Sequence, residues 1–187
     1  MKLVLFKDST LTEHATVPVL VYIHGGGTYI QPSTEFVQEV THTIAYIFGN
    51  PRNWPFEHWV QQSPNLVIVS VYYRLSAFGF LAAPGLRNSK YGDLNAGFLD
   101  QVEALKWVQK HISAFGGDPG RVTINGESAG GSSVELHLVA AATGYGDGKH
   151  SDKHLFNQAI AQSVYRIPVP LPEQQEVRQI QPMLLVC

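Results

Sequence analysis

The sequence has one cysteine among its 187 residues, and that cysteine is the last residue, Cys187. No disulfide within the chain is therefore possible. No apolar run reaches the ~20 residues that a helix needs to cross a membrane. The apolar start Leu3–Phe6 resembles the beginning of a signal peptide, but Lys7 and Asp8 interrupt it too early for one. We therefore predict no signal peptide and no membrane anchor in this chain, and its localisation stays unknown.

Charge is also sparse, since charged residues make up 15% of the chain and the net charge is −2. Nothing in that balance favours binding to nucleic acid or to an anionic membrane surface. His150 and His154 have the i,i+4 spacing of a metal-binding pair, but no third ligand has a suitable spacing. With 44% apolar residues, the length suits one domain with a sizeable core. We expect no nucleic-acid partner, metal or other cofactor, and the oligomeric state stays open.

What the chain does contain is glycine placed directly after strand-like segments. The β-branched run Arg121–Asn125 is followed by Gly126-Glu127-Ser128-Ala129-Gly130 and then by a helical pattern over 128–142. This arrangement fits the G-x-S-x-G nucleophile elbow, in which small residues flank a serine held in a strained turn. The amides and the dipole of the following helix favour negative charge beside that serine. By itself the pattern is weak, because any glycine-rich turn can produce it.

A second glycine-rich turn strengthens this interpretation. The apolar run Val17–Ile23 predicts a buried strand, and it ends in His24-Gly25-Gly26-Gly27. Turns of this HGGG type supply backbone N–H groups to an oxyanion in the same fold. We expect His24 to hydrogen-bond the backbone of this turn, which we call the HGGG turn, rather than to act as a base.

Three further segments carry a family resemblance. They are Val67–Leu75 with Phe78–Leu81, Asn95–Gln101, and Phe115–Pro119. Together with the two glycine turns, and in the same order, they resemble the motifs of type-B carboxylesterases, the family of carboxylesterases, cholinesterases and fungal lipases. The resemblance extends from Pro18 to Pro172 and implies an α/β-hydrolase fold with a mainly parallel sheet and flanking helices.

The residue patterns predict the individual elements of that fold. Apolar and β-branched runs predict strands over 3–6, 17–23, 66–72, 121–125 and 157–163, and helical patterns predict helices over 95–112 and 128–142. Residues 115–120 are expected to form a loop. Nearly continuous apolar runs are typical of central strands that are covered on both faces. The alternation of strands and helices predicts a mainly parallel sheet. The resemblance implies that the first strand is antiparallel.

The resemblance also implies a mechanism for hydrolysis of a small-molecule carboxylic ester. Ser128 attacks the carbonyl carbon and forms an acyl-enzyme. The amides of Gly26, Gly27 and Ala129 hold the oxyanion. Glu127 matches the residue that the family has beside its nucleophile, where it either stabilises the imidazolium of a histidine base or caps the start of the helix.

Three more residues are expected to have structural roles. The resemblance implies a buried ion pair between Arg74 and Asp118, which would link a strand end to the loop before the elbow; the alternative is that Arg74 is exposed and ends its strand. Ser163 stands at the serine of the family's Gln-Ser-Gly motif, behind the active site, although Val164 replaces the glycine.

The triad acid and histidine are missing from the expected places. In this fold they follow the serine, and the resemblance places them well beyond the strand that ends near residue 163. Residues 164–187 are too few for two more βα units of about 30 residues each. The helix carries His137 away from the elbow. His150 and His154 lie near Asp147 and Asp152, but a solvated loop is the simpler interpretation.

We therefore predict an incomplete α/β-hydrolase domain over 1–172 and a non-family tail over 173–187. The function indicated is that of a carboxylic ester hydrolase with a serine nucleophile. Two alternatives stay open: a truncated, catalytically inactive product that lacks the acid and the histidine, and a non-catalytic cholinesterase-like binding protein.

The resemblance is interrupted over 28–45. Joining Gly27 directly to Tyr46 restores the family pattern, so 28–45 is predicted to be an insertion. Codons for residues 27–29 and 176–178 can both contain a splice-donor sequence, which favours translated introns at 28–45 and 177–187. The alternative at 28–45 is a genuine helix capped by Ser33, with Phe36, Val40, Ile44 and Ile47 on one face.

Overall fold

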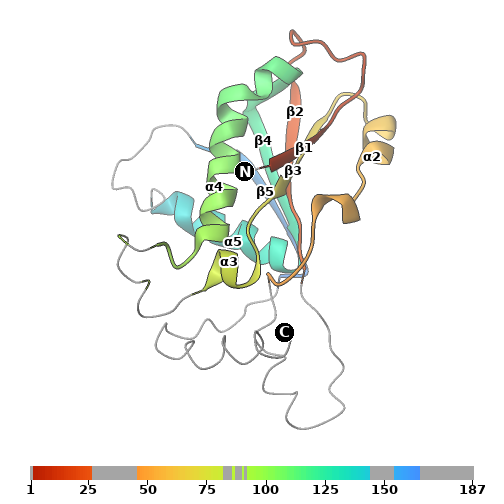
Figure 1. The fold of residues 1–187 in the computed structure, drawn as a ribbon. Coiled ribbons are helices and arrows are strands. Elements are labelled where there is room, and N and C mark those ends of the chain that lie inside the picture. Colours follow the sequence, from red (N-terminus) through yellow and green to blue (C-terminus); the bar gives the residue numbers. More distant parts are fainter. Residues whose placement is uncertain are drawn as a thin grey trace.

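The computed structural model describes residues 2–26, 46–81, 86, 90, 92–143 and 154–164. Within these residues the chain forms one five-stranded sheet with helices beside it (Figure 1). The strands are β1 (Lys2–Phe6), β2 (Val17–Ile23), β3 (Val67–Tyr72), β4 (Gly117–Glu127) and β5 (Gln158–Gln162). The helices are α2 (Glu57–Gln62), α3 (Ser76–Phe80), α4 (Ala96–His111) and α5 (Ala129–Ala142), with 3-10 turns η2 (Pro51–Asn53) and η4 (Ile112–Phe115).

The sheet is mainly parallel, as the sequence predicts. Its strand order is β1-β3-β2-β4-β5, and β1 pairs antiparallel with β3 while the other neighbours are parallel. Ile23, the last residue of β2, lies opposite Val71 of β3 and Gly126 of β4. The segments that follow these strands therefore meet at one edge of the sheet, which we call the carboxyl edge. The opposite edge, where β2 and β4 begin, is the amino edge.

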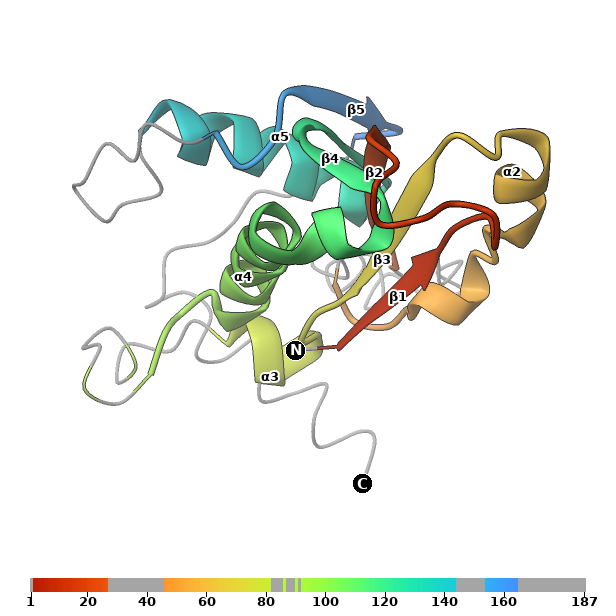
Figure 2. The same cartoon turned by 90° about the horizontal axis from the view of Figure 1, so that it is seen from above.

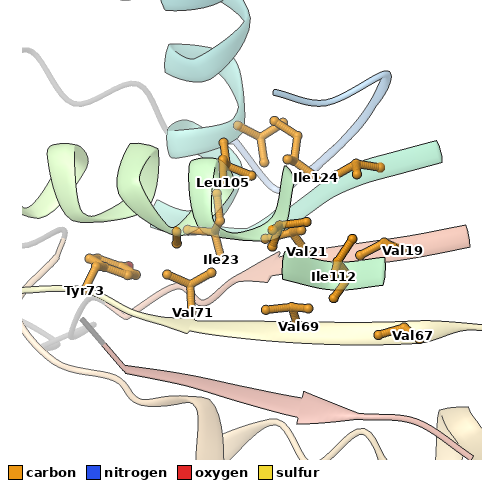
Figure 3. Close-up of a cluster of buried hydrophobic side chains, with 14 residues drawn as sticks. Val19, Val21, Ile23, Val67, Val69, Val71, Tyr73, Leu105, Ile112 and Ile124 are labelled. Carbon is orange, nitrogen blue, oxygen red and sulfur yellow. The ribbon is translucent and has the colours of Figure 1, made fainter. Parts of the chain in front are cut away.

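Both faces of the central strand are covered. Val19, Val21 and Ile23 of β2 pack in the main core with residues of β3, α4 and η4, and Figure 3 shows this cluster with Leu105 and Ile112. The alternate residues Leu20 and Tyr22 point to the other face, where they pack with residues of α2 and its flanks. Figure 2 shows α4 and α2 on opposite sides of the sheet. Burial on both faces explains the nearly continuous apolar runs of β2 and β3.

Most predicted elements are confirmed, but the predicted loop at 115–120 is wrong. The chain ends the 3-10 turn η4 at Phe115, reverses at Gly116 with a φ of 85°, and enters β4 at Gly117. A Cβ on Gly117 would stand 2.7 Å from side-chain atoms of both Ile112 and Val19. Glycine at this position lets β4 begin earlier than the apolar pattern indicates, because the pattern registers side chains and Gly117 has none.

Several predicted features lie outside the described residues. These are the insertion at 28–45 and the tail at 173–187. Among the described residues, no helix combines the length and the apolar composition that crossing a membrane requires.

Candidate active site

The predicted elbow forms with Ser128 at its apex. Ser128 stands between the end of β4 and the start of α5, with φ 57° and ψ −120°. Its backbone N–H donates to the Gln162 carbonyl at 3.0 Å, which ties the apex to β5. A non-glycine residue in this region of φ costs on the order of 1–3 kcal/mol and persists only where its surroundings hold it. The predicted strained serine is thus present.

Glycines around the serine permit close packing that no side chain would allow. A Cβ on Gly126 would overlap the Gly130 carbonyl, and a Cβ on Gly130 would overlap the carbonyl of Ile23 in β2. A Cβ on Gly131 would lie 2.5 Å from the Gln162 carbonyl oxygen of β5. The start of α5 is therefore pressed directly against the backbones of three strands.

The HGGG turn lies directly against the elbow. A Cβ on Gly25 would stand 2.5 Å from the Glu127 carbonyl oxygen and 3.2 Å from the Ser128 Cβ. Gly26 has a φ of 149°, and a Cβ there would overlap the carbonyl of Phe48. Gly27 lies outside the described residues. The two glycine-rich turns, about 100 residues apart in the sequence, therefore meet in space.

Gly25 is a site residue that the sequence analysis did not single out. Its position in the HGGG turn is the sequence feature that could have indicated it. Its importance lies in the close approach to Ser128, which only the three-dimensional arrangement reveals.

His24 holds the HGGG turn in place, as the sequence predicts. Its Nδ1 lies 2.8 Å from the Gly25 carbonyl oxygen, so Nδ1 carries the proton and donates. Its ring stacks between Trp54 and Tyr73, and the Tyr73 hydroxyl donates to the His24 carbonyl at 2.6 Å. Burial lowers the pKa of His24. The ring is thus neutral and engaged in structure.

The start of α5 leaves backbone donors beside the serine. The hydrogen bond from Ser132 N–H to the Ser128 carbonyl, at 3.0 Å, begins the helix. The N–H groups of Ala129, Gly130 and Gly131 precede it and have no carbonyl within the helix to bond. Ala129 is buried. Unpaired amides at a helix N-terminus favour an anionic oxygen next to Ser128.

Backbone strain gathers at the carboxyl edge. Among the described residues, the non-glycine residues with positive φ are Tyr46, Ser76, Ser128 and Ser163. The N–H of Ser76 donates to the Tyr46 carbonyl at 2.7 Å, and Ser163 directly follows the Gln162 carbonyl that Ser128 bonds. Strained residues cluster at functional sites because a rigid surrounding structure is needed to hold them.

Glu127 makes no capping hydrogen bond in the part of the chain that the structure describes. Its charge acts instead on Tyr22, which belongs to the central strand. Burial raises the pKa of Tyr22 to about 12, and the negative charge of Glu127 adds to that effect. The capping role considered for Glu127 is therefore not observed, and its role toward a histidine base stays a prediction.

The predicted ion pair between Arg74 and Asp118 is wrong. Arg74 pairs with Asp100 in the first turns of α4, with Nε 2.7 Å from Oδ2 and Nη2 2.8 Å from Oδ1. The Arg74 backbone N–H also donates to Asp100 Oδ2, at 3.0 Å. Burial raises the pKa of Asp100, but the hydrogen bonds and charge of Arg74 outweigh burial, so the pKa is lowered overall. Arg74 is exposed rather than buried.

Strand polarity explains this correction. Arg74 follows β3 at the carboxyl edge, whereas Asp118 stands at the start of β4, at the amino edge. About nine residues of extended strand, or roughly 30 Å, separate these edges. Asp118 instead binds its near neighbour Arg121, with Oδ2 2.9 Å from Nε. Hydrogen bonds from Arg121 and from the Gly120 N–H lower the pKa of Asp118.

Ser163 lies beside the elbow. Gln162 pairs with Glu127 in the β4–β5 register, so Ser163 comes level with Ser128. Ser163 is exposed and has a φ of 48°. Its predicted role behind the active site stays a prediction.

No described histidine hydrogen-bonds Ser128. His137 is buried nine positions further along α5, where its Nε2 bonds Gln101 Oε1 at 3.1 Å. Burial lowers the pKa of His137 to about 4. His154 is exposed, while His150 and the two nearby aspartates lie outside the described residues. Within the described ranges, no group of three or more metal-ligating side chains comes together.

A mainly parallel sheet flanked by helices, with a serine at a strained strand-to-helix turn, defines an α/β-hydrolase. The family model for the carboxylesterase family matches residues 5–181. The chain therefore belongs to the carboxylesterase family, and it is a partial α/β-hydrolase. The predicted domain boundary after residue 172 stays a prediction.

Individual relatives agree with this assignment. The chain is 35% identical to lipase 2 of Geotrichum candidum over 87% of its own length and 26% of the lipase. It is also 35% identical to liver carboxylesterase 1 of Oryctolagus cuniculus, over 85% of its length and 22% of the relative. The crystal structure of Aspergillus niger EstA matches with a TM-score of 0.63 and 37% identity, covering 85% of this chain and 26% of EstA. The chain thus spans about a quarter of the length of these relatives.

Proposed function

We propose that Ser128 is the nucleophile of a carboxylic ester hydrolase that works through an acyl-enzyme. Its Oγ forms a bond to the ester carbonyl carbon, the alcohol leaves after taking up a proton, and water then releases the acid. A histidine moves the proton in each step. The relatives named as a lipase and a carboxylesterase support this reaction class, and with it a small-molecule ester as substrate.

The observation that carries the proposal is the packing of the HGGG turn on the elbow. Gly25 approaches both Ser128 and the Glu127 carbonyl so closely that a Cβ would meet them. This packing supports a shared role at the serine for the amide of Gly26 from one turn and that of Ala129 from the other. We assign the oxyanion hole to these two amides and to Gly27. Each such donor contributes about 2.7–4 kcal/mol to transition-state stabilisation in serine hydrolases.

The general base and its acid partner are assigned to none of the described residues. Since a general base contributes about 10²–10⁴-fold, the 187-residue chain by itself is expected to hydrolyse short-chain aryl esters no faster than its Ser128→Ala variant. This expectation coincides with the alternative of an inactive product. Retention of the serine and of both glycine turns argues against a non-catalytic binding protein, which needs neither.

A fluorophosphonate probe tests the nucleophile directly. The Oγ of an activated serine forms a bond to phosphorus, the P–F bond breaks, and the hydroxyl proton passes to a base or to solvent. We expect slow labelling of the chain at Ser128, located by peptide mass spectrometry, and no labelling of Ser128→Ala. Ser113→Ala is the matched control, because Ser113 is exposed in η4 at the amino edge. Labelling of Ser128→Ala at the wild-type rate would refute the assignment.

A further inference from the structure

A line of hydrogen-bonded polar side chains, three of them buried and Tyr46 half-buried, connects α4 and α5 with the segment 46–49. The Tyr46 hydroxyl lies 2.9 Å from Ser133 Oγ in α5. Gln101 Nε2 of α4 donates to the same Ser133 Oγ at 3.1 Å, and Gln101 Oε1 lies 3.1 Å from His137 Nε2. Ser133, Gln101 and His137 are at most 1% exposed. The proposed mechanism uses none of these four side chains.

The amide of Gln101 fixes the donor and acceptor roles of its own two hydrogen bonds. Since Gln101 donates through its amide nitrogen to Ser133, its oxygen faces His137 and can only accept. His137 therefore carries a proton on Nε2, and because burial lowers its pKa to about 4, the ring is neutral near pH 7. The ring is also held by stacking on Phe98 of α4, with 4.4 Å between ring centroids. The hydrogen bonds of Gln101 to Ser133 and His137 thus join α4 to α5 inside the core.

Tyr46 carries the line to the HGGG turn. It begins the segment 46–49, and the carbonyl of Phe48 occupies the space that a Cβ on Gly26 would need. A Cβ on Gly49 would lie 2.5 Å from the Gly25 carbonyl oxygen and 2.7 Å from His24 Nδ1. The HGGG turn thus packs directly against the segment 46–49.

Tyr46 is itself held firmly. It has a positive φ of 66°, its carbonyl accepts from Ser76 N–H at 2.7 Å, and its ring stacks on Phe80 at 4.4 Å between centroids. Its hydroxyl is the group that reaches α5, the helix that begins at the nucleophile. Ser133 lies five residues after Ser128, about one and a half helical turns.

We propose that Tyr46 is a positioning residue that fixes the HGGG turn relative to the nucleophile helix, through the hydrogen bond between its hydroxyl and Ser133. The catalytic meaning of this role rests on the proposed function, because the turn matters to the reaction only if its amides hold the oxyanion. The positional role itself is a property of the fold and is testable separately.

Tyr46→Phe isolates the hydroxyl. The phenylalanine ring keeps the stacking on Phe80, and Gln101 still donates to Ser133, so the buried Ser133 hydroxyl keeps a hydrogen-bond partner. Tyr72→Phe is the matched control. Tyr72 ends β3, and its hydroxyl makes no hydrogen bond within the part of the chain that the structure describes.

The first measurement is amide hydrogen exchange followed by mass spectrometry on the full chain. In Tyr46→Phe we expect exchange in peptides covering 22–26 and 46–50 to rise about tenfold, the scale of losing one buried hydrogen bond. Peptides of α4 are expected to exchange as in the wild type, and Tyr72→Phe is expected to change neither region. Unchanged exchange at 22–26 in Tyr46→Phe would overturn the proposal, whatever the chain's reactivity.

The second measurement is the kinetics of fluorophosphonate labelling. A positioning role predicts that Tyr46→Phe lowers the maximal labelling rate about tenfold and leaves the half-saturating probe concentration unchanged, because only the reacting geometry is disturbed. Ser133→Ala is expected to lower the rate by at least as much, since it removes the partner of Gln101 as well, and adding Tyr46→Phe to it should lower the rate no further. Multiplying effects in the double variant would refute action through Ser133. If the wild-type chain is not labelled at all, the proposed function fails for this chain, and hydrogen exchange alone decides the positional role.

Discussion

Both edges of the sheet contain glycine turns and hydrogen-bonded side chains, but their local structures differ. At the amino edge, Gly116 turns the chain with a left-handed φ, and Asp118 bonds its near neighbours Gly120 and Arg121. At the carboxyl edge, backbones press together so closely that Gly25, Gly126 and Gly130 cannot carry a side chain. Bonds at this edge also join residues far apart in the sequence, as Tyr46 and Ser133 do across 87 positions.

The two edges differ in backbone strain rather than in close packing. A Cβ on Gly116 at the amino edge would lie 2.5 Å from the Thr12 carbonyl oxygen, and Arg121 bonds the Thr16 carbonyl across 105 positions, but among the described residues no non-glycine residue at that edge has a positive φ. If the carboxyl edge holds the proposed active site, it must aim backbone amides and a hydroxyl at one point, and strained residues with long-range contacts are what hold such a geometry. The positive φ angles of Tyr46, Ser76, Ser128 and Ser163 all fall near the carboxyl edge. The sharpest tests therefore place the same substitution at each edge.

Alanine in place of glycine should give the largest contrast. Gly25→Ala forces a Cβ against the Glu127 carbonyl and Ser128. We expect it to lower the free energy of unfolding by about 1–3 kcal/mol, as overpacking does. We expect fluorophosphonate labelling to slow by about 10²-fold, as a displacement of about 1 Å does.

The control for this substitution is Gly120→Ala at the amino edge. There a Cβ would meet only the carboxylate end of Asp118, at 3.1 Å, which can move aside. Labelling at the wild-type rate and little loss of stability are expected for this variant in urea unfolding. Equal effects of the two substitutions would show that the carboxyl edge is not specially constrained.

The sequence predicts the carboxyl edge in outline because glycine spacing records close approaches. Ser128, the bounds of β2 and α5, and the backbone bond of His24 all follow from local patterns. The ion-pair partner of Arg74 does not follow from a local pattern, because a motif identifies the arginine but not the carboxylate that it contacts. Strand polarity could have excluded Asp118. A residue that follows one strand and a residue that precedes a parallel strand lie at opposite edges of the sheet.

Other features left no signal in the sequence. The bond between Tyr46 and Ser133 depends on how α5 lies over the sheet, and no periodicity relates the two residues. Gly117 belongs to a strand although its pattern resembles a loop, because the pairing with Val17 decides its conformation. Long-range pairing thus determined what local preference left open.

The next prediction concerns the pH dependence of stability that the buried His137 causes. Burial lowers the pKa of His137 to about 4, below its value of about 6.5 in an unfolded chain. The unfolded state therefore binds more protons between these values, so the free energy of unfolding falls as the pH drops from 6.5 toward 4. From pH 7 to pH 5 we expect a loss of about 2 kcal/mol attributable to this group, measured by urea unfolding.

Two substitutions separate His137 from the other titrating groups. His137→Gln keeps a donor for Gln101 but does not titrate, so it should flatten the pH dependence. His111→Gln, at an exposed position at the end of α4, is the matched control for replacing a histidine by glutamine. His24, whose pKa burial also lowers, contributes in the same direction in every variant. A slope in His137→Gln as steep as in the wild type would contradict the burial of this group as a neutral ring.

The smallest contrast lies between the two arginine–aspartate pairs. Arg74 and Asp100 form a bidentate pair supported by a backbone N–H, and the Asp100 side chain is 20% exposed. Arg121 and Asp118 are neighbours in one strand, and that carboxylate is 30% exposed. Because solvent screens both pairs, we expect Asp100→Asn to lower the free energy of unfolding by about 1 kcal/mol and Asp118→Asn by less than about 0.5 kcal/mol.

The pH dependence of these two pairs follows from the lowered pKa of each aspartate. Each pair stabilises the fold above the unfolded-state pKa of about 3.9, and the stabilisation is lost as the pH falls through the lower folded-state value. At pH 7 both carboxylates are charged, so urea unfolding there measures the full contribution of each pair. The pair at the carboxyl edge joins the end of β3 to α4 across 26 positions, whereas the other joins residues only three apart in the sequence. A larger loss for Asp118→Asn than for Asp100→Asn would mean that the local pair matters more, and the contrast between the edges would then not extend to their ion pairs.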